Sequence, residues 1–231
     1  MKHLIEATDL NSLPITEYDR IILDSTTNDI IVRGGVTYEY VDLGLPSGLK
    51  WAKCNVGAEK ETDYGDFFMW GSTKPNTASE CTWTNAPFNN GSSKFNSTYF
   101  NSVKGTVCPN NVLAKEYDAA TQIMGSDWRM PTQTEWQELL SGTTNEWVTI
   151  NGVNGRKFTS KTDTSKYIFI PAAGSCYDGS LINVGSRGYI WSSSLDTSNP
   201  DRAWNWGFNS GNCYRGNNYL CDGRSVRGVR K

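Results

Sequence analysis

Residues able to do covalent or metal chemistry are few in this chain of 231 residues. It has six cysteines and a single histidine, His3. No two cysteines form a C-x-x-C pair, so a zinc site is not expected. A Ser-His-Asp or Cys-His arrangement would have to use His3, which lies in the kind of terminal segment that is usually poorly ordered. The sequence therefore predicts no enzyme, no catalytic residue, no metal site and no cofactor.

Residue types that are common in binding surfaces are concentrated near the C-terminus, in the stretch NPDRAWNWGFNSGNCYRGNNYLCDGR at residues 199–224. This stretch is rich in Asn, Gly, Tyr, Trp and Arg, and it lacks Lys, Glu, Val and Ile. Tyr and Trp give large contact area at low entropic cost, while Ser, Gly and Asn give adaptable hydrogen bonds. Arg, Trp and Tyr dominate binding hot spots, whereas Lys and Glu are depleted in interfaces. The composition predicts a ligand-binding surface.

The candidate binding residues have an alternative interpretation. Asn, Gly and Ser are also ordinary turn formers. Trp204, Trp206 and Phe208 alternate at the period of a strand and could all face a core. The candidate ligand-binding residues are Arg187, Asp196, Asp201, Arg202, Trp204, Trp206, Cys213, Tyr214, Arg215, Tyr219, Leu220, Asp222 and Arg224. Those expected to be exposed are Arg202, Tyr214, Arg215, Tyr219, Leu220 and Arg224.

Length, composition and charge exclude several classes of protein. The length suits one domain with a small appendage. The net charge is −2 and no basic stripe is visible, so nucleic acid is not an expected partner. No apolar run approaches the ~18 residues of a membrane span. The N-terminus, MKHLIEATDLNSLP, lacks the apolar region of a secretory signal, so reduced thiols are expected.

Residues 1–36 are predicted to form an N-terminal appendage, separate from a main domain at 37–231. The runs RIIL at 20–23 and DIIV at 29–32 flank the polar turn DSTTN and predict a β-hairpin. The following RGG at 33–35 breaks the pattern. Two strands bury little surface by themselves. We therefore expect this appendage to serve attachment or oligomerisation.

The main domain alternates strand-like runs with turns and contains two predicted helices. The first covers residues 114–124 and ends at Gly125. The second begins at Thr132, which forms a T-x-x-E capping box with Glu135. Trp136, Leu139 and Leu140 then share one helical face. Residues 72–112 are loop-rich, and the residues after 142 are mostly strands. The pattern predicts an α+β domain.

Several separated motifs occur in a characteristic order. They are DLGLPSGLKWAKCNVGA, YGDFFMWG, WRMPTQTEWQELL, PAAG and YIWSSS. In these motifs the chain resembles the Fibrobacter/Bacteroides-type major paralogous domain, a C-type-lectin-like group related to formylglycine-generating enzyme. The resemblance covers roughly residues 38–230. It implies a loop-rich C-type-lectin-like fold with two helices and several short antiparallel strands, to which the N-terminal β-hairpin is appended.

Some proteins of this fold are variable proteins of diversity-generating retroelements, in which a C-terminal stretch is rewritten by mutation at template adenines. Scattered Asn residues among Asp, Arg, Gly, Cys, Tyr and Leu are similar to that output, with WSSS and SVRGVR as fixed borders. The resemblance implies a receptor-binding or adhesin-like protein with a variable region at about 182–230. Its ligand would be a protein or glycan on a cell surface. The protein would lie on a phage virion or bacterial surface, and analogy with phage receptor-binding proteins suggests a homotrimer.

Three alternatives stay open. A formylglycine-generating-like oxidase would have to use Cys213 and Cys221, whose spacing is wider than that of the family's cysteine pair. A calcium-dependent lectin would need six to eight oxygen ligands, for which Asp196 and the NPD at 199–201 are weak candidates. The domain could also be only a structural spacer.

Overall fold

The computed structural model describes residues 20–23, 30–33 and 38–231. The chain divides into two compact units, Met1–Tyr38 and Glu39–Lys231. In the first unit, β1 (Arg20–Leu23) pairs antiparallel with β2 (Ile30–Arg33), as the two β-branched runs predicted. The turn expected between them lies outside the described residues. The role of this unit in attachment or oligomerisation stays a prediction.

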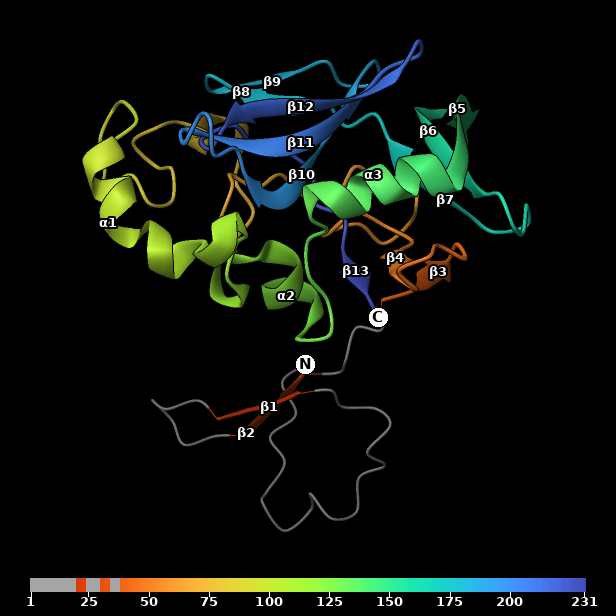
Figure 1. Cartoon of the computed structure of the whole chain (residues 1–231), viewed down its shortest axis with the longest axis horizontal. Helices are drawn as coiled ribbons and strands as arrows, with labels where there is room; N and C mark the ends of the chain where they lie inside the picture. Colours follow the sequence, from red (N-terminus) through yellow and green to blue (C-terminus); the bar gives the residue numbers. More distant parts are fainter. Residues whose placement is uncertain (1–19, 24–29, 34–37) are drawn as a thin grey trace. The chain divides into compact units, whose positions relative to one another are not determined.

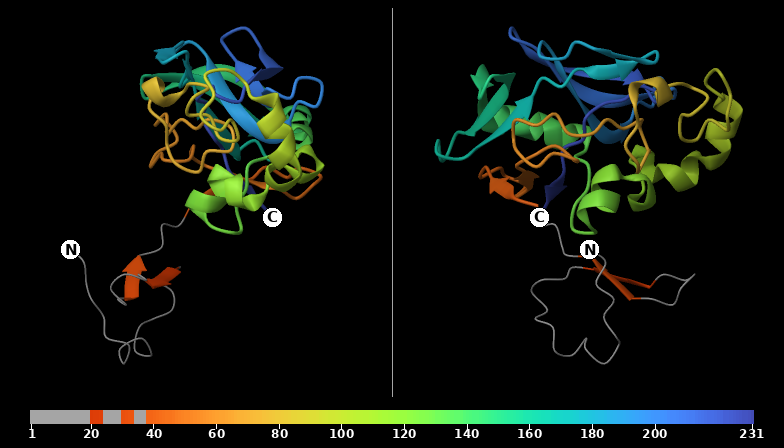
Figure 2. Two further views of the ribbon diagram at one scale, coloured as in Figure 1. Left: turned by 90° about the vertical axis from the view of Figure 1, so that its left-hand side faces the viewer. Right: turned by 180° about the vertical axis from the view of Figure 1, so that it is seen from behind.

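The second unit is an α+β domain with few helices and several small antiparallel sheets (Figure 1). One sheet has the order β13-β4-β3, from Val229–Arg230, Lys50–Ala52 and Tyr40–Asp42. A second contains β5 (Thr143–Ile150), β6 (Val153–Ser160) and β7 (Tyr167–Pro171). A third contains β10 (Gly188–Leu195), β11 (Arg202–Phe208) and β12 (Cys213–Tyr219). The hairpin of β8 (Ser175–Tyr177) and β9 (Ser180–Ile182) lies beside this third sheet in both views of Figure 2.

Three α-helices occur in the described residues, where the sequence predicted two. They are α1 (Ser97–Val107), α2 (Ala119–Met124) and α3 (Gln133–Gly142). Helix α1 lies in the segment expected to be loop, and it begins where Asn96 accepts a hydrogen bond from the Tyr99 amide. Short 3-10 turns at Ala78–Glu80, Pro109–Asn111 and Lys115–Tyr117 complete the helical segments.

The helix predicted over 114–124 is interrupted at Asp118. This residue is extended, and its carboxylate accepts from the amides of Thr121 at 2.9 Å and Met130 at 2.8 Å. A buried carboxylate that caps a helix must leave the helical conformation itself. The prediction of one continuous helix was therefore wrong, because Asp118 starts α2 instead of continuing an earlier helix.

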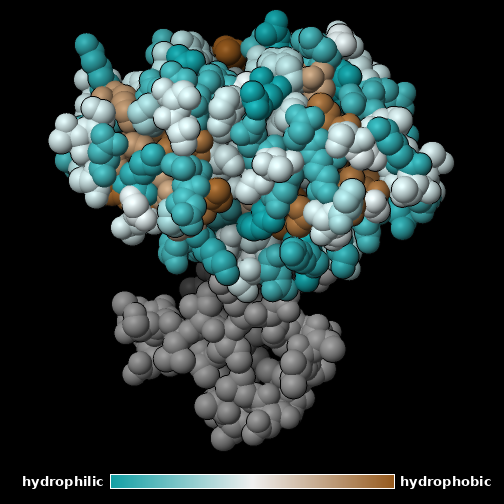
Figure 3. All heavy atoms as spheres, viewed as in Figure 1, coloured by the Kyte–Doolittle hydropathy of each residue, from teal (hydrophilic) through white to brown (hydrophobic). Residues whose placement is uncertain are grey.

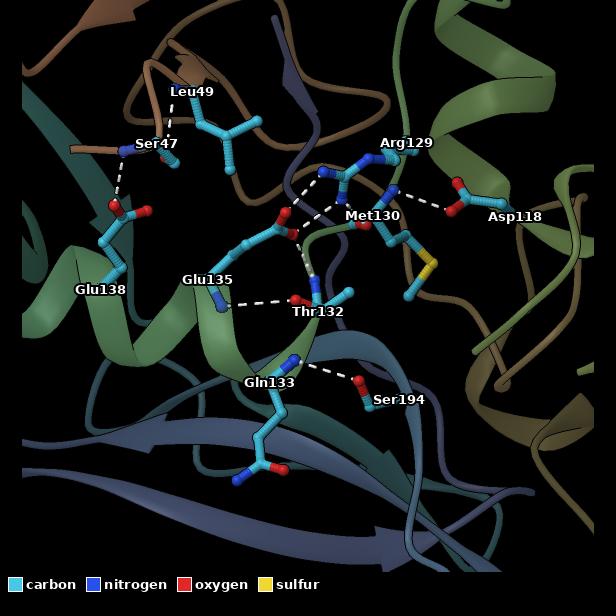
Figure 4. A network of polar contacts seen from close by, with 10 residues as sticks. All are labelled: Ser47, Leu49, Asp118, Arg129, Met130, Thr132, Gln133, Glu135, Glu138 and Ser194. Atoms are coloured by element: carbon cyan, nitrogen blue, oxygen red, sulfur yellow. Dashed lines mark hydrogen bonds and ion pairs between the residues drawn. The ribbon is translucent and has the colours of Figure 1, made fainter. Parts of the chain in front are cut away.

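The capping box predicted for α3 is confirmed and is part of a larger network (Figure 4). Thr132 Oγ1 accepts from the Glu135 amide at 3.3 Å, and Glu135 accepts from the Thr132 amide at 2.8 Å. The guanidinium of Arg129 makes a two-point contact with the same carboxylate, at 2.7 and 2.5 Å. The Gln133 amide donates to Ser194 Oγ of β10 at 3.1 Å. These contacts fix the start of α3 against the third sheet.

Helix α3 places Trp136 and Leu139 in the main hydrophobic core, while Leu140 is half-buried against it. The Trp136 ring meets Trp51 of β4 at 4.7 Å and Trp206 of β11 at 6.5 Å between ring centroids. Such aromatic pairs add to the energy of area burial. The helix therefore joins the sheet that contains the chain's last strand to the sheet that contains the candidate binding residues.

The fully buried side chain of Arg227 links three further segments. Its guanidinium donates to the backbone carbonyls of Ala52, Lys53 and Phe169 at 2.9, 2.6 and 2.9 Å. Its Nε donates to Asn55 Oδ1 at 3.0 Å. Burial lowers the pKa of Arg227 to about 10, which still leaves it charged at neutral pH.

Replacing Trp136 by alanine should reduce the free energy of unfolding by about 3–5 kcal/mol, since it removes a large aromatic side chain from a packed core. Urea denaturation measures the change. Gln137→Ala is the matched control, because Gln137 is exposed on the same helix and should change stability by less than about 0.5 kcal/mol. A loss below about 1 kcal/mol for Trp136→Ala would contradict its place in the core.

Glu135 should make stability depend on acid. Burial alone would raise its pKa, but hydrogen bonds from Arg129 and Thr132 outweigh burial and hold the pKa below the ordinary 4.5. A depressed folded-state pKa gives stability that is present above pH 4.5 and is lost as pH falls through the folded value. Wild type should therefore exceed Glu135→Gln in stability at pH 7, and the gap should narrow below pH ~4.5. Thermal melts of both proteins against pH measure it, and a gap independent of pH would contradict this assignment.

Candidate ligand-binding surface

Strands β11 and β12 bring most of the candidate residues onto one antiparallel pair. Directly opposite residues share a face of a sheet, and successive residues alternate between faces. Arg202 lies opposite Tyr219, Trp204 opposite Asn217, and Trp206 opposite Arg215. One face of the pair therefore combines two arginines with three aromatic side chains and an asparagine.

Side-chain contacts order the outer part of this face. The Arg202 guanidinium lies over the Tyr219 ring at 4.5 Å, and it also donates to Tyr219 Oη at 3.2 Å and to Asn217 Oδ1 at 3.3 Å. The Arg215 guanidinium lies over the Trp204 ring, again at 4.5 Å. Cation–π contacts of partly exposed groups stabilise by about 0.5–1 kcal/mol each, enough to favour one arrangement. We call Arg202, Trp204, Arg215, Asn217 and Tyr219 the arginine–aromatic ladder.

Arg215, Asn217 and Tyr219 of the ladder lie on the edge strand β12, whereas Arg202 and Trp204 lie on the central strand β11. In the order β10-β11-β12 the strand β12 has one neighbour, and none of its seven residues is buried. Arg215 is exposed and the rest are half-buried. Seven register pairs with β11 nevertheless fix its backbone. The strand thus holds adaptable side chains on a defined backbone.

The opposite face of the sheet carries a second group, the tyrosine cluster of Arg187, Tyr189 and Tyr214. Tyr189 and Tyr214 flank Gly207 in the register. The Tyr214 ring covers Gly207 so closely that a Cβ there would lie 2.6 Å from it. The Arg187 side chain hydrogen-bonds to Tyr189, and Tyr189 and Tyr214 hydrogen-bond to each other. Burial is the main cause that raises the pKa of Tyr214, and Tyr189 adds to it. Arg187 is exposed, as its candidate role requires.

Asp196 is buried, and its carboxylate is used within the protein. It accepts from the Ser198 amide at 3.0 Å and from the side-chain amides of Asn199 at 3.0 Å and Asn217 at 2.6 Å. Burial would raise its pKa, but these hydrogen bonds hold the pKa below its usual value. Asp196 therefore shapes the turn before β11 and fixes Asn217. Its candidate role as a direct ligand contact is corrected, whereas Asp201 stays partly exposed.

Leu220, Asp222 and Arg224 are also corrected. Leu220 and Arg224 were expected to be exposed, yet they are only 1% and 2% exposed, and Asp222 is as buried as Arg224. The backbone explains this: Leu220 accepts from the Trp70 amide and Arg224 forms a bridge with Phe68, so the chain after β12 turns inward. The charge of Arg224 is offset by Asp222 at 3.1 Å and by stacking on Tyr189 and Trp191.

The three alternating aromatic residues of β11 do not all have the same role: two belong to the core, and one belongs to the accessible face. Trp206 and Phe208 are buried in the core, so Trp206 is corrected from a ligand residue to a scaffold residue. Trp204 is half-buried and belongs to the ladder. Cys213 is half-buried against the core, and burial raises the pKa of its thiol to about 11. Its sulfur is thus protonated at neutral pH and serves packing.

Sequence reasoning missed some accessible residues. Tyr189 and Asn217 belong to the two groups above but were not among the candidates. Exposed large hydrophobic side chains also gather on and after the β8–β9 hairpin; they are Tyr177, Leu181, Ile182 and Val184. The apolar pair in SLINV, directly after an Asp-Gly turn, could have indicated them. In Figure 3 hydrophobic side chains on the face shown are scattered among hydrophilic ones.

Comparison with family models, curated proteins and solved structures finds no match to this chain. Within the part of the chain that the structure describes, no helix is long and apolar enough to cross a membrane. The same residues contain no group of three or more His, Cys, Asp or Glu side chains placed to hold a metal ion.

Leu220→Ala should lower the free energy of unfolding by about 2–5 kcal/mol, because a buried leucine leaves a cavity. Arg215→Ala, its control five residues earlier on β12, should change it by no more than about 1 kcal/mol, the size of the cation–π contact with Trp204 that is lost. Urea denaturation of both variants distinguishes the inward-turning segment from the displayed strand. Equal, small effects would show that Leu220 is not part of the core.

Proposed function

We propose that this protein binds a ligand, in the manner of a receptor-binding or adhesin-like protein, through diversified side chains on β11 and β12. The observation that carries the proposal is the arginine–aromatic ladder. Arg, Tyr and Trp, the residues of binding hot spots, lie accessible on a strand pair whose backbone is fixed by its register. A surface of this kind can change its side chains without changing the fold.

Burial along the C-terminal region supports the proposed origin in a diversity-generating retroelement. Trp191, Ser192 and Ser193 in the preceding border and Ser225 to Val229 in the following one are buried, whereas β12 between them is not. Constant borders around a displayed strand are what such diversification requires. The displayed set proposed here is Arg187, Arg202, Trp204, Tyr214, Arg215, Asn217 and Tyr219. The variable region proposed at about 182–230 is thus restricted to fewer positions.

The fold proposed for this scaffold is C-type-lectin-like, in line with the motif resemblance. The ligand is a protein or glycan on a cell surface, met from a phage virion or bacterial surface, and residues 1–36 supply attachment or a trimer contact. A standard interface buries about 800 Å² per partner. The ladder and the tyrosine cluster lie on opposite faces of the sheet, so the ligand would meet the β12 edge and the side chains that flank it.

Two alternatives are less well supported. A calcium-dependent lectin would recruit Asp196, whose carboxylate already accepts three protein hydrogen bonds. A formylglycine-generating-like oxidase would use Cys213 and Cys221. Burial is the main cause that raises the pKa of Cys213 to about 11 and that of Cys221 to about 12. Such pKa values disfavour the thiolate, which is the form that binds a metal.

The DNA around the gene tests the proposal directly. A near-copy of the segment that encodes residues 182–230 should lie beside a reverse-transcriptase gene. Mismatches between the two copies should fall on template adenines and in codons of the displayed set. Mismatches concentrated instead in codons 220–224 would contradict the division between displayed and buried positions.

Tyr214→Ser and Arg215→Ser should separate binding from stability. Each should shift stability by no more than about 1 kcal/mol, because neither side chain lies in the core and the surface contacts that are lost are of that size. Loss of a Tyr or Arg anchor should weaken binding by about 2 kcal/mol or more, which is over tenfold. Thermal melts measure the stability of each variant. Binding is measured by titrating the labelled full chain onto intact bacterial cells that the wild-type protein stains.

Gln137→Ser and Val226→Ala are the controls. Gln137 is exposed on α3, so its substitution should leave both stability and staining unchanged. Val226 is buried in the closing segment, so its substitution should lower stability. If the two β12 variants melt early while staining falls only in proportion, these residues are scaffold and the proposed surface is wrong.

A further inference from the structure

Three buried cysteines lie together in one cluster, against which Tyr219 at the end of β12 packs. Cys81 follows the 3-10 turn Ala78–Glu80, Cys176 is the central residue of β8, and Cys221 follows β12. All three belong to one hydrophobic cluster with Met69 and Ala86. They come from segments far apart in the sequence, so only the fold brings them together.

Two of these thiols are in direct contact. The side chains of Cys81 and Cys176 hydrogen-bond to each other. The single thiol hydrogen of Cys81 has a second acceptor in reach, the Thr77 carbonyl at 3.4 Å. A disulfide needs two sulfurs that can approach to bonding distance without backbone movement, and thiols already in contact meet much of that requirement.

Gly223 makes room for this contact. Its amide donates to the Cys176 carbonyl at 2.9 Å, and the Cys176 amide donates to the Gly223 carbonyl at 2.8 Å. A Cβ at residue 223 would lie 2.5 Å from Cys81 Sγ and 3.3 Å from Cys176 Sγ. Any side chain there would therefore displace the Cys81 sulfur. The glycine keeps open the space in which the two sulfurs meet.

We propose that Cys81 and Cys176 form a redox-active dithiol that closes to a disulfide when a peroxide oxidises it. The cysteine pair that carries this inference is observed whether or not the proposed binding function holds.

The two thiols differ in their electrostatic environment, which assigns their roles. The hydrogen bond from Cys81 lowers the pKa of Cys176; burial opposes this, and the nearby charge of Arg224 adds to it. The same hydrogen bond, and then burial, raise the pKa of Cys81. Cys176 is thus the nucleophile and Cys81 the resolving thiol, because the thiolate is the form that attacks.

The reaction balances with the peroxide as the only oxidant. The Cys176 thiolate attacks one oxygen of hydrogen peroxide, the O–O bond breaks, and Cys176 becomes a sulfenic acid while a proton and hydroxide leave as water. Cys81 sulfur then attacks the sulfenic sulfur, the S–O bond breaks, and the Cys81 proton leaves with hydroxide as a second water. Two thiols lose two electrons in total, and the peroxide gains them.

Closure would tie the long irregular segment around Cys81 to β8. The Trp83 ring, two residues after Cys81, packs against Tyr219 at 5.8 Å between centroids. Linking residues 81 and 176 closes a long loop in the unfolded chain, and such cross-links stabilise the folded state. The oxidised protein should therefore melt at a higher temperature than the reduced one.

Peptide mapping of the full chain tests the proposal. The reduced, folded protein is treated with hydrogen peroxide, free thiols are alkylated after unfolding, and digestion without reduction is followed by mass spectrometry. The Cys81 and Cys176 peptides should appear joined, with the loss of two hydrogen atoms. The melting temperature should rise, and a dithiol reductant should reverse both changes.

Cys176→Ser should lose the cross-link and the rise in melting temperature, while Cys108→Ser, which changes a buried cysteine outside the cluster, should keep both. The wild-type map decides alone if a serine variant does not fold. Cys54 is partly exposed, so its oxidation in the same sample shows that the dose of peroxide was sufficient. A cross-link through Cys221, or unlinked and alkylated Cys81 and Cys176 once Cys54 is oxidised, would overturn the proposal.

Discussion

The second unit depends on the hydrogen bonds that the fully buried guanidinium of Arg227 donates. This guanidinium donates to carbonyls at the end of β4 and in β7 and to the side chain of Asn55, so one charge connects the first sheet, the second sheet and the chain's closing segment. Removing a charge from water is costly unless its hydrogen-bonding groups are satisfied. Four hydrogen bonds from this side chain meet that condition. Because Arg227 and β13 hold the C-terminus against β4, the stretch before them must return to a fixed point whatever side chains it carries.

That constraint explains why the C-terminal stretch is half surface and half interior. Strand β12 runs along the edge of its sheet and stays accessible, but from Leu220 onward the chain must turn inward to reach β4. Backbone groups of this inward-turning stretch are then paired with partners inside the protein, as in the pairs Leu220–Trp70 and Arg224–Phe68. A buried backbone needs such partners. The position of a residue relative to this turn therefore determines whether it is displayed, and residue type alone does not.

Sequence reasoning succeeded where local chemistry determines structure. Thr132 and Glu135 specify the start of α3 through contacts three residues apart, and the alternation of Trp204, Trp206 and Phe208 locates β11. It failed where distant partners decide. Asp118 reads as part of a helix until the Met130 amide is seen to bind its carboxylate. Arginine is a residue type that is common in interfaces, so the sequence places Arg224 on the surface. Only its stacking on Tyr189 and its pairing with Asp222 show that it is interior. The functional proposal itself rests on composition and resemblance, which the architecture accommodates through the accessible side chains of β12.

Arg224 also connects the surface with the interior of the domain. Its guanidinium stacks on Tyr189, a member of the tyrosine cluster, at 4.6 Å. The same charge lies close enough to Cys176 to favour its thiolate. Burial lowers the pKa of Arg224 itself, while Asp222 favours its charged form. A charged group that lies close to both the tyrosine cluster and Cys176 cannot be moved without changing both. The glycine that precedes it gives the two sulfurs their space, so residues 222–224 form a compact junction whose sequence is constrained by the ion pair, the stacking and the thiol contact together.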